Sequence, residues 1–506
     1  MKKIVLGVIA LSILHSILFY AQDLGISVVL FTISELLLVI YSLKSRNKVK
    51  NSNAFFLSIP IAAISLTYAL FNNVFFYIMN FFAIIGLTGI MIVWAIYGEF
   101  NFKNIIINTI LVIFKPIIYI GEAVKLIYKN IFNKNQTKSE GKIKETVKES
   151  KVFKQILLGF VISIPLLIII LALLISADSV FAQFLEPIKQ LIANIFSIRF
   201  WASMYFRIFV FLIVCIYFMA FICNILKFDT ETKKVQNGME IRMQNITVNT
   251  VLTVLNIVYL LFSIVQFTYL FTQIGTDGSF NYAEYARKGF FQLMIVTIIN
   301  FAIILLTNAN KRETSKVVNI YTKIMNLFLI IFTVIMICSS FLRMSLYEHE
   351  FGYTFLRLMV FFILVTELVL IVPTVAYVFT KKVKLLKSYI VILAIMYSLI
   401  NFTNVDKTIA AKNVDKYIVD SKLEVSKERS KADFNYLKKL SIDAIPDIIR
   451  LYDNTDDEIL KLRIRTYLNN EYYKKVEGKE ESNFQEFNYQ KEKGKIELRN
   501  WKYANK

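Results

Sequence analysis

The chain has few of the residues from which soluble enzymes build catalytic and cofactor-binding loops. Its 506 residues include only 15 glycines, and no glycine-rich phosphate-binding loop occurs. The motifs HExxH, GxSxG and CxxC are also absent, which excludes the usual signatures of zinc proteases, serine hydrolases and thiol oxidoreductases. The sequence therefore predicts no cofactor and names no catalytic residue.

Cysteine and histidine are equally scarce. The three cysteines all lie in apolar runs: Cys215, Cys223 and Cys338. Small core-filling residues are the favoured interpretation, rather than a disulfide framework or a zinc site. His349 stands between Glu348 and Glu350 but has no second histidine beside it, so we predict no metal site.

Apolar residues, by contrast, are abundant. They make up 56% of the chain and include 44 phenylalanines, far more than one soluble core needs. A membrane-spanning helix requires about 20 mostly apolar residues. By that rule we predict eleven spans, at residues 4–20, 26–43, 54–71, 74–97, 155–177, 204–226, 246–271, 289–307, 322–342, 355–379 and 387–402.

The first predicted span resembles a signal peptide, because a basic start precedes its apolar stretch. Phe19 and Ala21 would make a poor cleavage pair, and a second apolar run follows at once. We therefore expect an uncleaved first helix.

Residues 104–132 are apolar in part, but Lys115 and Pro116 interrupt them, so we expect an interfacial helix there. With eleven spans, the loops assigned to the inside carry 29 lysines and arginines and the opposite loops carry 7. This bias predicts an inside N-terminus and an outside C-terminus. We therefore expect the net charge of +21 to interact with anionic lipids of the bilayer rather than with nucleic acid.

The predicted fold is therefore an all-α polytopic transmembrane bundle with a small helical extracytoplasmic tail domain. We divide it into a four-helix part (1–103), a cytoplasmic interfacial helix and charged linker (104–154), a seven-helix core (155–402) and the tail (403–506). In the tail, apolar residues recur at helical spacing from Phe434 to Ile449, and Asp456, Asp457 and Glu458 open a helix that runs through Leu468.

Under this topology, the unusual polar side chains all lie at the outer face. The candidate cluster comprises Asp178, Arg207, Tyr282, Glu284, Tyr285, Arg287, Arg343, Tyr347, Glu348, Arg357, Asp406 and Asn413. Outer loops favour arginine and inner loops lysine, and arginine suits bidentate pairing in partly buried places.

Two interpretations of this cluster remain open. In the structural one, Asn281 caps a helix with Glu284 at its third position, the tyrosines belong to the interfacial aromatic belt, and ion pairs clamp helix ends. In the functional one, the charged residues line a pocket that opens outward. Glu35 is the only acid that we place well inside a span, and it either pairs with His15 as a proton relay or reaches toward the interface.

Several short stretches also carry a family resemblance. They are SADSVF (176–181), VQFTYLF (265–271), YAEYARKGFFQL (282–293), RMSLYEHEFGYTFLR (343–357), NVDKTIAAKN (404–413), YLKKLSIDAIP (436–446) and NWKYANK (500–506). From about residue 155 to its end, the chain resembles an uncharacterised bacterial family of polytopic membrane proteins with a domain of unknown function. The resemblance implies an integral membrane protein and supplies no activity.

Three functions follow as hypotheses for a multi-pass protein of the bacterial cytoplasmic membrane. The first is a non-enzymatic envelope sensor, regulator or assembly factor that binds an envelope protein or a lipid-linked ligand at its outer face. The second is a transporter, which an absent internal repeat and scarce mid-membrane charge disfavour. The third is an outer-leaflet transferase acting on a lipid-linked substrate.

Overall fold

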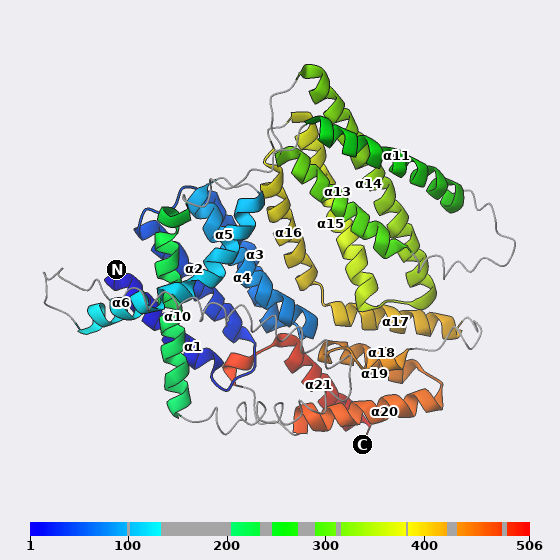
Figure 1. The fold of residues 1–506 in the computed structure, drawn as a ribbon. Helices are drawn as coiled ribbons and strands as arrows, with labels where there is room; N and C mark the ends of the chain where they lie inside the picture. The colour runs from blue at the N-terminus through cyan, green and yellow to red at the C-terminus, as the bar shows by residue number, and fades with distance from the viewer. Residues whose placement is uncertain are drawn as a thin grey trace, which may run out of the picture. The chain divides into compact units, whose positions relative to one another are not determined.

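The computed structural model describes residues 1–98, 102–132, 204–232, 245–271, 289–309, 315–380, 383–422, 433–477 and 483–505. Every regular element in these residues is a helix (Figure 1). The described residues fall into two compact units. The first unit comprises those within 1–69, 79–237 and 482–488, and the second those within 70–78, 238–481 and 489–506.

Ten helices of the described residues are long and apolar enough to cross a bilayer. They confirm ten of the eleven predicted spans, and the remaining one, at residues 155–177, lies outside the described residues. The protein is therefore an all-α polytopic membrane protein.

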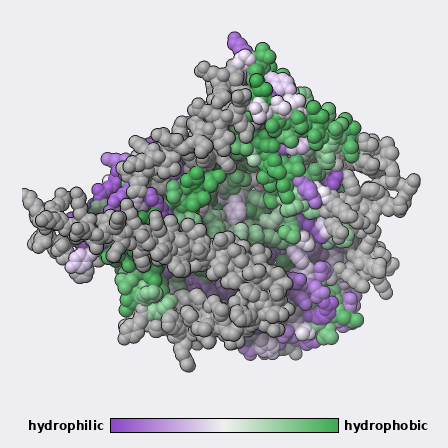
Figure 2. All heavy atoms as spheres, in the orientation of Figure 1, coloured by the Kyte–Doolittle hydropathy of each residue, from purple (hydrophilic) through white to green (hydrophobic). Residues whose placement is uncertain are grey.

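Large apolar side chains on these helices face outward. Leu37, Leu261 and Val372 are 64%, 61% and 69% exposed. Figure 2 shows such hydrophobic side chains gathered over helices of the second unit. Contiguous apolar surface of this kind would be unfavourable in water, so lipid is the solvent that it fits.

In the first unit, α1 (Lys2–Phe19) packs against α2 (Ile26–Ser45) and α10 (Met204–Thr232). The turn between α1 and α2 contacts the short helix η5 (Phe484–Glu486). A Cβ atom on Gly25 would lie 2.6 Å from the carbonyl carbon of Glu486, so glycine is required for this approach.

The predicted interfacial segment forms two helices of 13 residues, α5 (Phe102–Phe114) and α6 (Ile120–Phe132), joined by the 3-10 turn η2 (Lys115–Tyr119). The α-helix breaks at Pro116, because the proline ring clashes with the preceding turn and proline has no N–H to donate. All three elements pack against α10, where Cys215 and Cys223 are buried, as predicted for core-filling residues. The same prediction is wrong for Cys338, which is exposed. The unit also contains η1 (Ser52–Leu57), α3 (Ser58–Leu70) up to Ala69, and α4 (Val74–Tyr97) from Met79 onward.

The second unit contains five apolar helices, which lie side by side in Figure 1: α11 (Asn245–Phe271), α13 (Phe290–Ala309), α14 (Lys316–Phe351), α15 (Phe355–Thr380) and α16 (Leu385–Phe402). α14 contacts α11, α13 and α15, and α16 packs against α15. Because lipid supplies no hydrophobic drive between helices, buried hydrogen bonds contribute to their association. Thr322 donates to Asn249 at 2.8 Å, and Asn256 donates to the carbonyl of Met325 at 2.9 Å.

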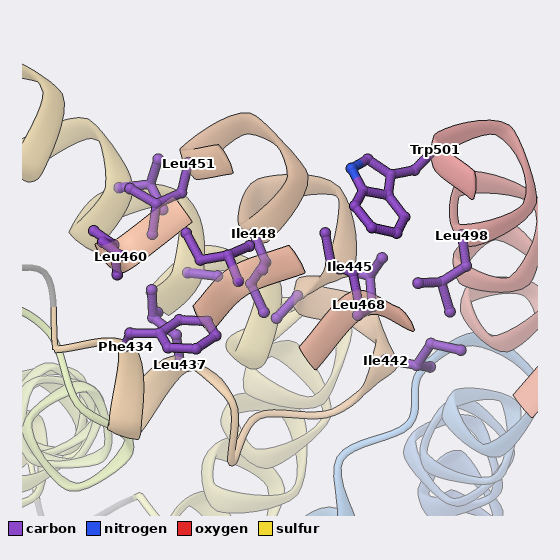
Figure 3. Close-up of a cluster of buried hydrophobic side chains, with 14 residues drawn as sticks. Phe434, Leu437, Ile442, Ile445, Ile448, Leu451, Leu460, Leu468, Leu498 and Trp501 are labelled. Atoms are coloured by element: carbon purple, nitrogen blue, oxygen red, sulfur yellow. The ribbon is translucent and has the colours of Figure 1, made fainter. Parts of the chain in front are cut away.

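The second unit also contains the tail domain, which we define as α17 to α21. Its elements are α17 (Val405–Lys422), α18 (Phe434–Leu437), η3 (Ile442–Ala444), α19 (Ile445–Asn454), α20 (Glu458–Tyr472), η4 (Tyr473–Glu477) and α21 (Tyr489–Ala504). Side chains from these helices, including Ile448, Leu468 and Trp501, form one buried apolar core (Figure 3). The helices of the tail therefore share one apolar core within the second unit.

The helix predicted after the acidic run Asp456 to Glu458 is confirmed, and Asp457 caps it by accepting from Ile459 N and Leu460 N. The apolar spacing from Phe434 to Ile449 does not form one continuous helix. Pro446 starts a new helix at this point, because proline is favourable in a first turn and unfavourable in a helix interior.

Candidate functional site

The turn between α14 and α15 carries several of the predicted polar residues. α14 ends at Gly352, whose φ of +73° lies in the left-handed region that favours glycine. Its N–H donates to the carbonyl of Glu348 at 2.7 Å, which closes the last turn of the helix.

Arg357, in the first turn of α15, folds back onto this helix end. Its guanidinium donates to the carbonyl of Phe351 at 2.9 Å and also to the carbonyl of Gly352. The guanidinium carbon lies 4.2 Å from the centroid of the Tyr347 ring. A cation over an aromatic ring at a helix C-terminus gains both cation–π and dipole stabilisation, so Arg357 stabilises the turn between the two helices.

Arg343 lies one helical turn before Tyr347 and is buried, with 6% of its surface exposed. Its guanidinium packs against the backbone of Gly289, which has a φ of +101° and precedes α13. The Tyr347 ring stacks on Phe290 with 6.4 Å between centroids. Arg343 and Tyr347 therefore join the start of α13 to the last turns of α14.

Asn413 connects the same turn to the tail domain. From α17, its Oδ1 accepts from Tyr353 N at 2.7 Å and its Nδ2 donates to Tyr353 O at 2.8 Å. The Tyr436 hydroxyl accepts from Phe355 N at 2.7 Å, which satisfies an N–H at the start of α15. Lys416 adds a hydrogen bond from its ammonium to the carbonyl of His349.

Glu348 lies beside the Tyr353 side chain. Burial raises the pKa of the Tyr353 phenol, and the charge and hydrogen bonding of Glu348 raise it further. Because a carboxylate accepts hydrogen bonds and cannot donate them, a neutral phenol is the form that fits this pair.

Two acids of the tail domain hold the loop between α3 and α4. Asp406 accepts from Asn73 Nδ2 at 2.8 Å and from Ser441 N at 3.1 Å. Asp443 accepts from Asn72 N at 3.1 Å. Burial raises the pKa of Asp443 to about 6, and the charge of Asp406 adds to the rise while Lys475 opposes it.

These contacts tie two loops of the bundle to the tail domain within the second unit. We call the contacting residues the loop clamp: Asn72, Asn73, Arg357, Asp406, Asn413, Tyr436 and Asp443. Most of its hydrogen bonds pair a side chain with a backbone group at a helix end or loop. Such contacts orient and stabilise elements, and none of them brings a base beside a nucleophile.

Of the twelve predicted residues, the second unit brings together Arg343, Tyr347, Glu348, Arg357, Asp406 and Asn413. Arg207 lies in the first unit, where its Nε donates to Ser16 Oγ at 3.1 Å and its guanidinium lies 5.0 Å from the Tyr20 ring. The other five lie outside the described residues: Asp178, Tyr282, Glu284, Tyr285 and Arg287.

Sequence reasoning missed Asn72 and Asn73, which stand between two apolar runs, and it did not single out Tyr436 and Asp443 within the stretch YLKKLSIDAIP. It also overlooked Glu367, although the stretch VTELVL places that acid inside a predicted span. The expected scarcity of mid-membrane charge is therefore wrong at this position. The acid that was singled out instead, Glu35, is half-buried, and the His15 ring packs against the Phe31 ring at 5.4 Å.

In the part of the chain that the structure describes, no group of three or more His, Cys, Asp or Glu residues could hold a metal ion. Comparison with known proteins finds no matching curated protein and no matching solved structure. A family model matches residues 58–451, which include the bundle of the second unit and all of the loop clamp. The chain thus belongs to the family described as Domain of unknown function (DUF4153).

Proposed function

We propose that this protein is a non-enzymatic sensor, regulator or assembly factor of the bacterial cytoplasmic membrane, and that its tail domain binds an envelope partner at the outer face. The observation that carries the proposal is the loop clamp. Its polar side chains are used to hold a folded domain on loops of the membrane bundle, rather than to surround a reactive atom.

The clamp also supports the predicted number of spans. Asn73, before α4, and the turn at Gly352 and Tyr353, after α14, both contact α17. Between them, the described residues contain five span-length helices: α4, α10, α11, α13 and α14. Five crossings would put the two loops on opposite faces of the membrane, whereas their shared contact with α17 requires an even number.

The predicted eleven-span topology, in which a span at residues 155–177 lies between α4 and α10, meets this requirement, although that stretch lies outside the described residues. Together with the excess of lysine and arginine in the alternate loops, this count favours an outside location for the clamp and the tail domain.

The tail domain offers a surface for a partner on α20. Ile459 and Leu462 are 74% and 65% exposed and lie one helical turn apart. Two adjacent exposed apolar side chains on a domain that already has a core are suited to contact another protein.

A photo-crosslinking amino acid at Ile459 or Leu462, introduced in living cells, tests this proposal. We expect a discrete adduct with an envelope protein, and a weaker adduct at equal protein abundance when Asp406→Asn and Asn413→Ala are combined. The same crosslinker at the lipid-facing Val372 serves as control. The absence of an adduct at both α20 positions, or adducts identical to those at Val372, would overturn the proposal.

The transporter hypothesis gains one specific observation, which is a buried acid in the middle of a spanning helix. Glu367 is 3% exposed in α15, and Pro373 lies inside the same helix six residues later. Acids and broken helices at mid-membrane are features of transport sites. Uptake by proteoliposomes that depends on Glu367 would favour transport over the sensor role.

A further inference from the structure

Glu367 lies near the middle of α15 and is enclosed by the helices of the second unit. Its residue exposure is 3%, and that of Thr297, on the facing helix α13, is 0%. Ionised carboxylates at this depth are costly, and those that occur are usually paired or functional. Among the described residues, no cation forms an ion pair with Glu367.

The hydrogen-bonding groups around Glu367 indicate which protonation state fits the site. Thr297 Oγ1 lies 2.9 Å from each carboxyl oxygen and 2.7 Å from the carbonyl oxygen of Met294. A hydroxyl group has only one proton, so it cannot donate to all three acceptors. If the carboxyl is protonated, Glu367 donates to the Thr297 hydroxyl, and Thr297 donates to the carbonyl of Met294. The carboxyl proton and the hydroxyl proton then each have one acceptor.

A band of buried polar side chains continues from this site across three helices. One turn along α13, Asn300 donates to Thr333 of α14 at 2.9 Å and accepts from the Tyr259 hydroxyl of α11 at 2.8 Å. Asn300 and Thr333 are 0% and 2% exposed. The carboxyl therefore adjoins a neutral polar network, which can stabilise a neutral acid but supplies no charge to balance a carboxylate.

The charged groups on the neighbouring helices lie toward the helix ends, and the titratable groups within the helices include Tyr259 of α11, which donates to Asn300, and Cys338 of α14, which is exposed. α13 contains no charged or titratable side chain between Phe290 and Ala309. On α14, Arg343 lies toward the outer end and Lys323 toward the inner end. On α16, the Tyr389 hydroxyl pairs with Thr374 at 2.6 Å, and Tyr397 packs against Phe76. On α17, the charged groups Asp406, Lys407, Lys412, Asp415 and Lys416 lie outside the spans.

α15 also contains a point where its backbone can change conformation. Pro373 cannot donate to the carbonyl one turn before it, which leaves the helix with one fewer hydrogen bond. Thr374 bonds back to the carbonyl of Leu370 at 2.6 Å, and such bonds accompany helix bending. A hinge close to a buried acid is the kind of element by which a proton site gains access to water.

We propose that Glu367 is a mid-membrane proton-binding site, with Thr297 as the residue that positions its carboxyl. This inference goes beyond the sensor role and does not depend on the tail domain or its partner. The ligand is the proton itself, which leaves and rejoins the carboxyl while the neutral network around it stays in place.

Infrared difference spectroscopy of the purified full-length protein in lipid tests the proposal. The wild-type spectrum minus that of Glu367→Gln should contain the carbonyl stretch of a protonated carboxylic acid near neutral pH. The band should shift when H2O is replaced by D2O, because a binding site exchanges its proton. A difference spectrum with carboxylate bands alone, or a band that does not respond to D2O, would overturn the proposal.

Thr297→Val provides a second readout in which the acid is retained. Loss of the Thr297 hydroxyl should move the carbonyl band to higher frequency, because the carboxyl loses its hydrogen-bonding partner. If Glu367→Gln does not fold, labelling of the wild-type protein with a hydrophobic carbodiimide, followed by peptide mass spectrometry, replaces the subtraction. Such reagents modify protonated carboxyls in apolar surroundings, so labelling of Glu367 that falls as the pH rises is expected, and its absence would contradict the site.

Discussion

Asn413 of the tail domain satisfies both backbone hydrogen-bonding groups of Tyr353, one accepted at 2.7 Å and one donated at 2.8 Å. A side-chain amide has one oxygen acceptor and two N–H donors, so it can accept from the N–H of a residue and donate to the carbonyl of the same residue at once. The turn that follows α14 would otherwise have to find these partners in water. Asn413 therefore couples the folding of the tail domain to the geometry of the membrane turn.

Asn413→Ala removes both hydrogen bonds and leaves two backbone groups of a half-buried turn without this partner. We expect a loss of about 1–3 kcal/mol in stability, which should lower the unfolding temperature of the purified protein. Lys412→Ala, at the exposed neighbouring position, should leave it unchanged. Equal effects of the two substitutions would show that the amide contributes nothing specific.

Gly352→Ala should destabilise the same turn for a steric reason. The residue has a φ of +73°, and an added Cβ would lie 2.7 Å from Asn413 Oδ1. A cost of about 1–2 kcal/mol is expected from the backbone strain alone. Gly86→Ala is the matched control, because no atom lies within 4 Å of its Cβ position and it occupies a helix. Thermal unfolding should separate the two variants clearly.

Asp443 should make the stability of the tail domain depend on pH. Its pKa rises from 3.8 to about 6 on folding, so the folded state binds the proton more tightly than the unfolded state. The stabilising contribution is fully present below the unfolded pKa and is lost as the pH rises through about 6, with a total change of about 3 kcal/mol. Asp443→Asn should therefore be more stable than the wild type at neutral pH, and this advantage should vanish in acid.

Unfolding temperatures measured across this pH range check the prediction. Asp453→Asn, which changes an exposed acid of the same domain, should show no such pH-dependent gain. A constant difference between Asp443→Asn and the wild type at every pH would contradict the account, because it would mean that the carboxyl does not titrate in this window.

Leu468→Ala tests whether the tail is a domain with a packed core. Leu468 is 0% exposed within that core, and truncation of such a leucine costs about 2–5 kcal/mol. Limited proteolysis should then cleave the tail faster while the spanning helices stay protected. Leu462→Ala, on the exposed face of the same helix, should leave the cleavage rate unchanged.

The spanning helices could be predicted because their signal is local. An apolar run of about 20 residues has few other stable conformations, and ten predicted spans are present in the described residues. The cap at Asp457 could be predicted for the same reason, since a short acid before an apolar helix satisfies the first free N–H groups.

The loop clamp could be predicted only in part, because it depends on pairs that are distant in the sequence. Asn73 and Asp406 are separated by 333 positions, and only Asp406 stands in a stretch that carries the resemblance. The resemblance includes the stretches that contain Tyr353, Arg357 and Asn413, but it does not indicate which residues contact each other. Glu367 could have been recognised by a systematic count of acids inside the predicted spans.

The central claim is that the tail domain and the loops it holds share the outer face of the membrane. It is tested most directly by a membrane-impermeant maleimide applied to intact cells that carry Ile459→Cys in a background with Cys215, Cys223 and Cys338 replaced by alanine. We expect Ile459→Cys to be labelled in intact cells and Arg46→Cys, in a loop assigned to the inside, only after permeabilisation. Labelling of Ile459→Cys only after permeabilisation would place the tail in the cytoplasm and contradict the account.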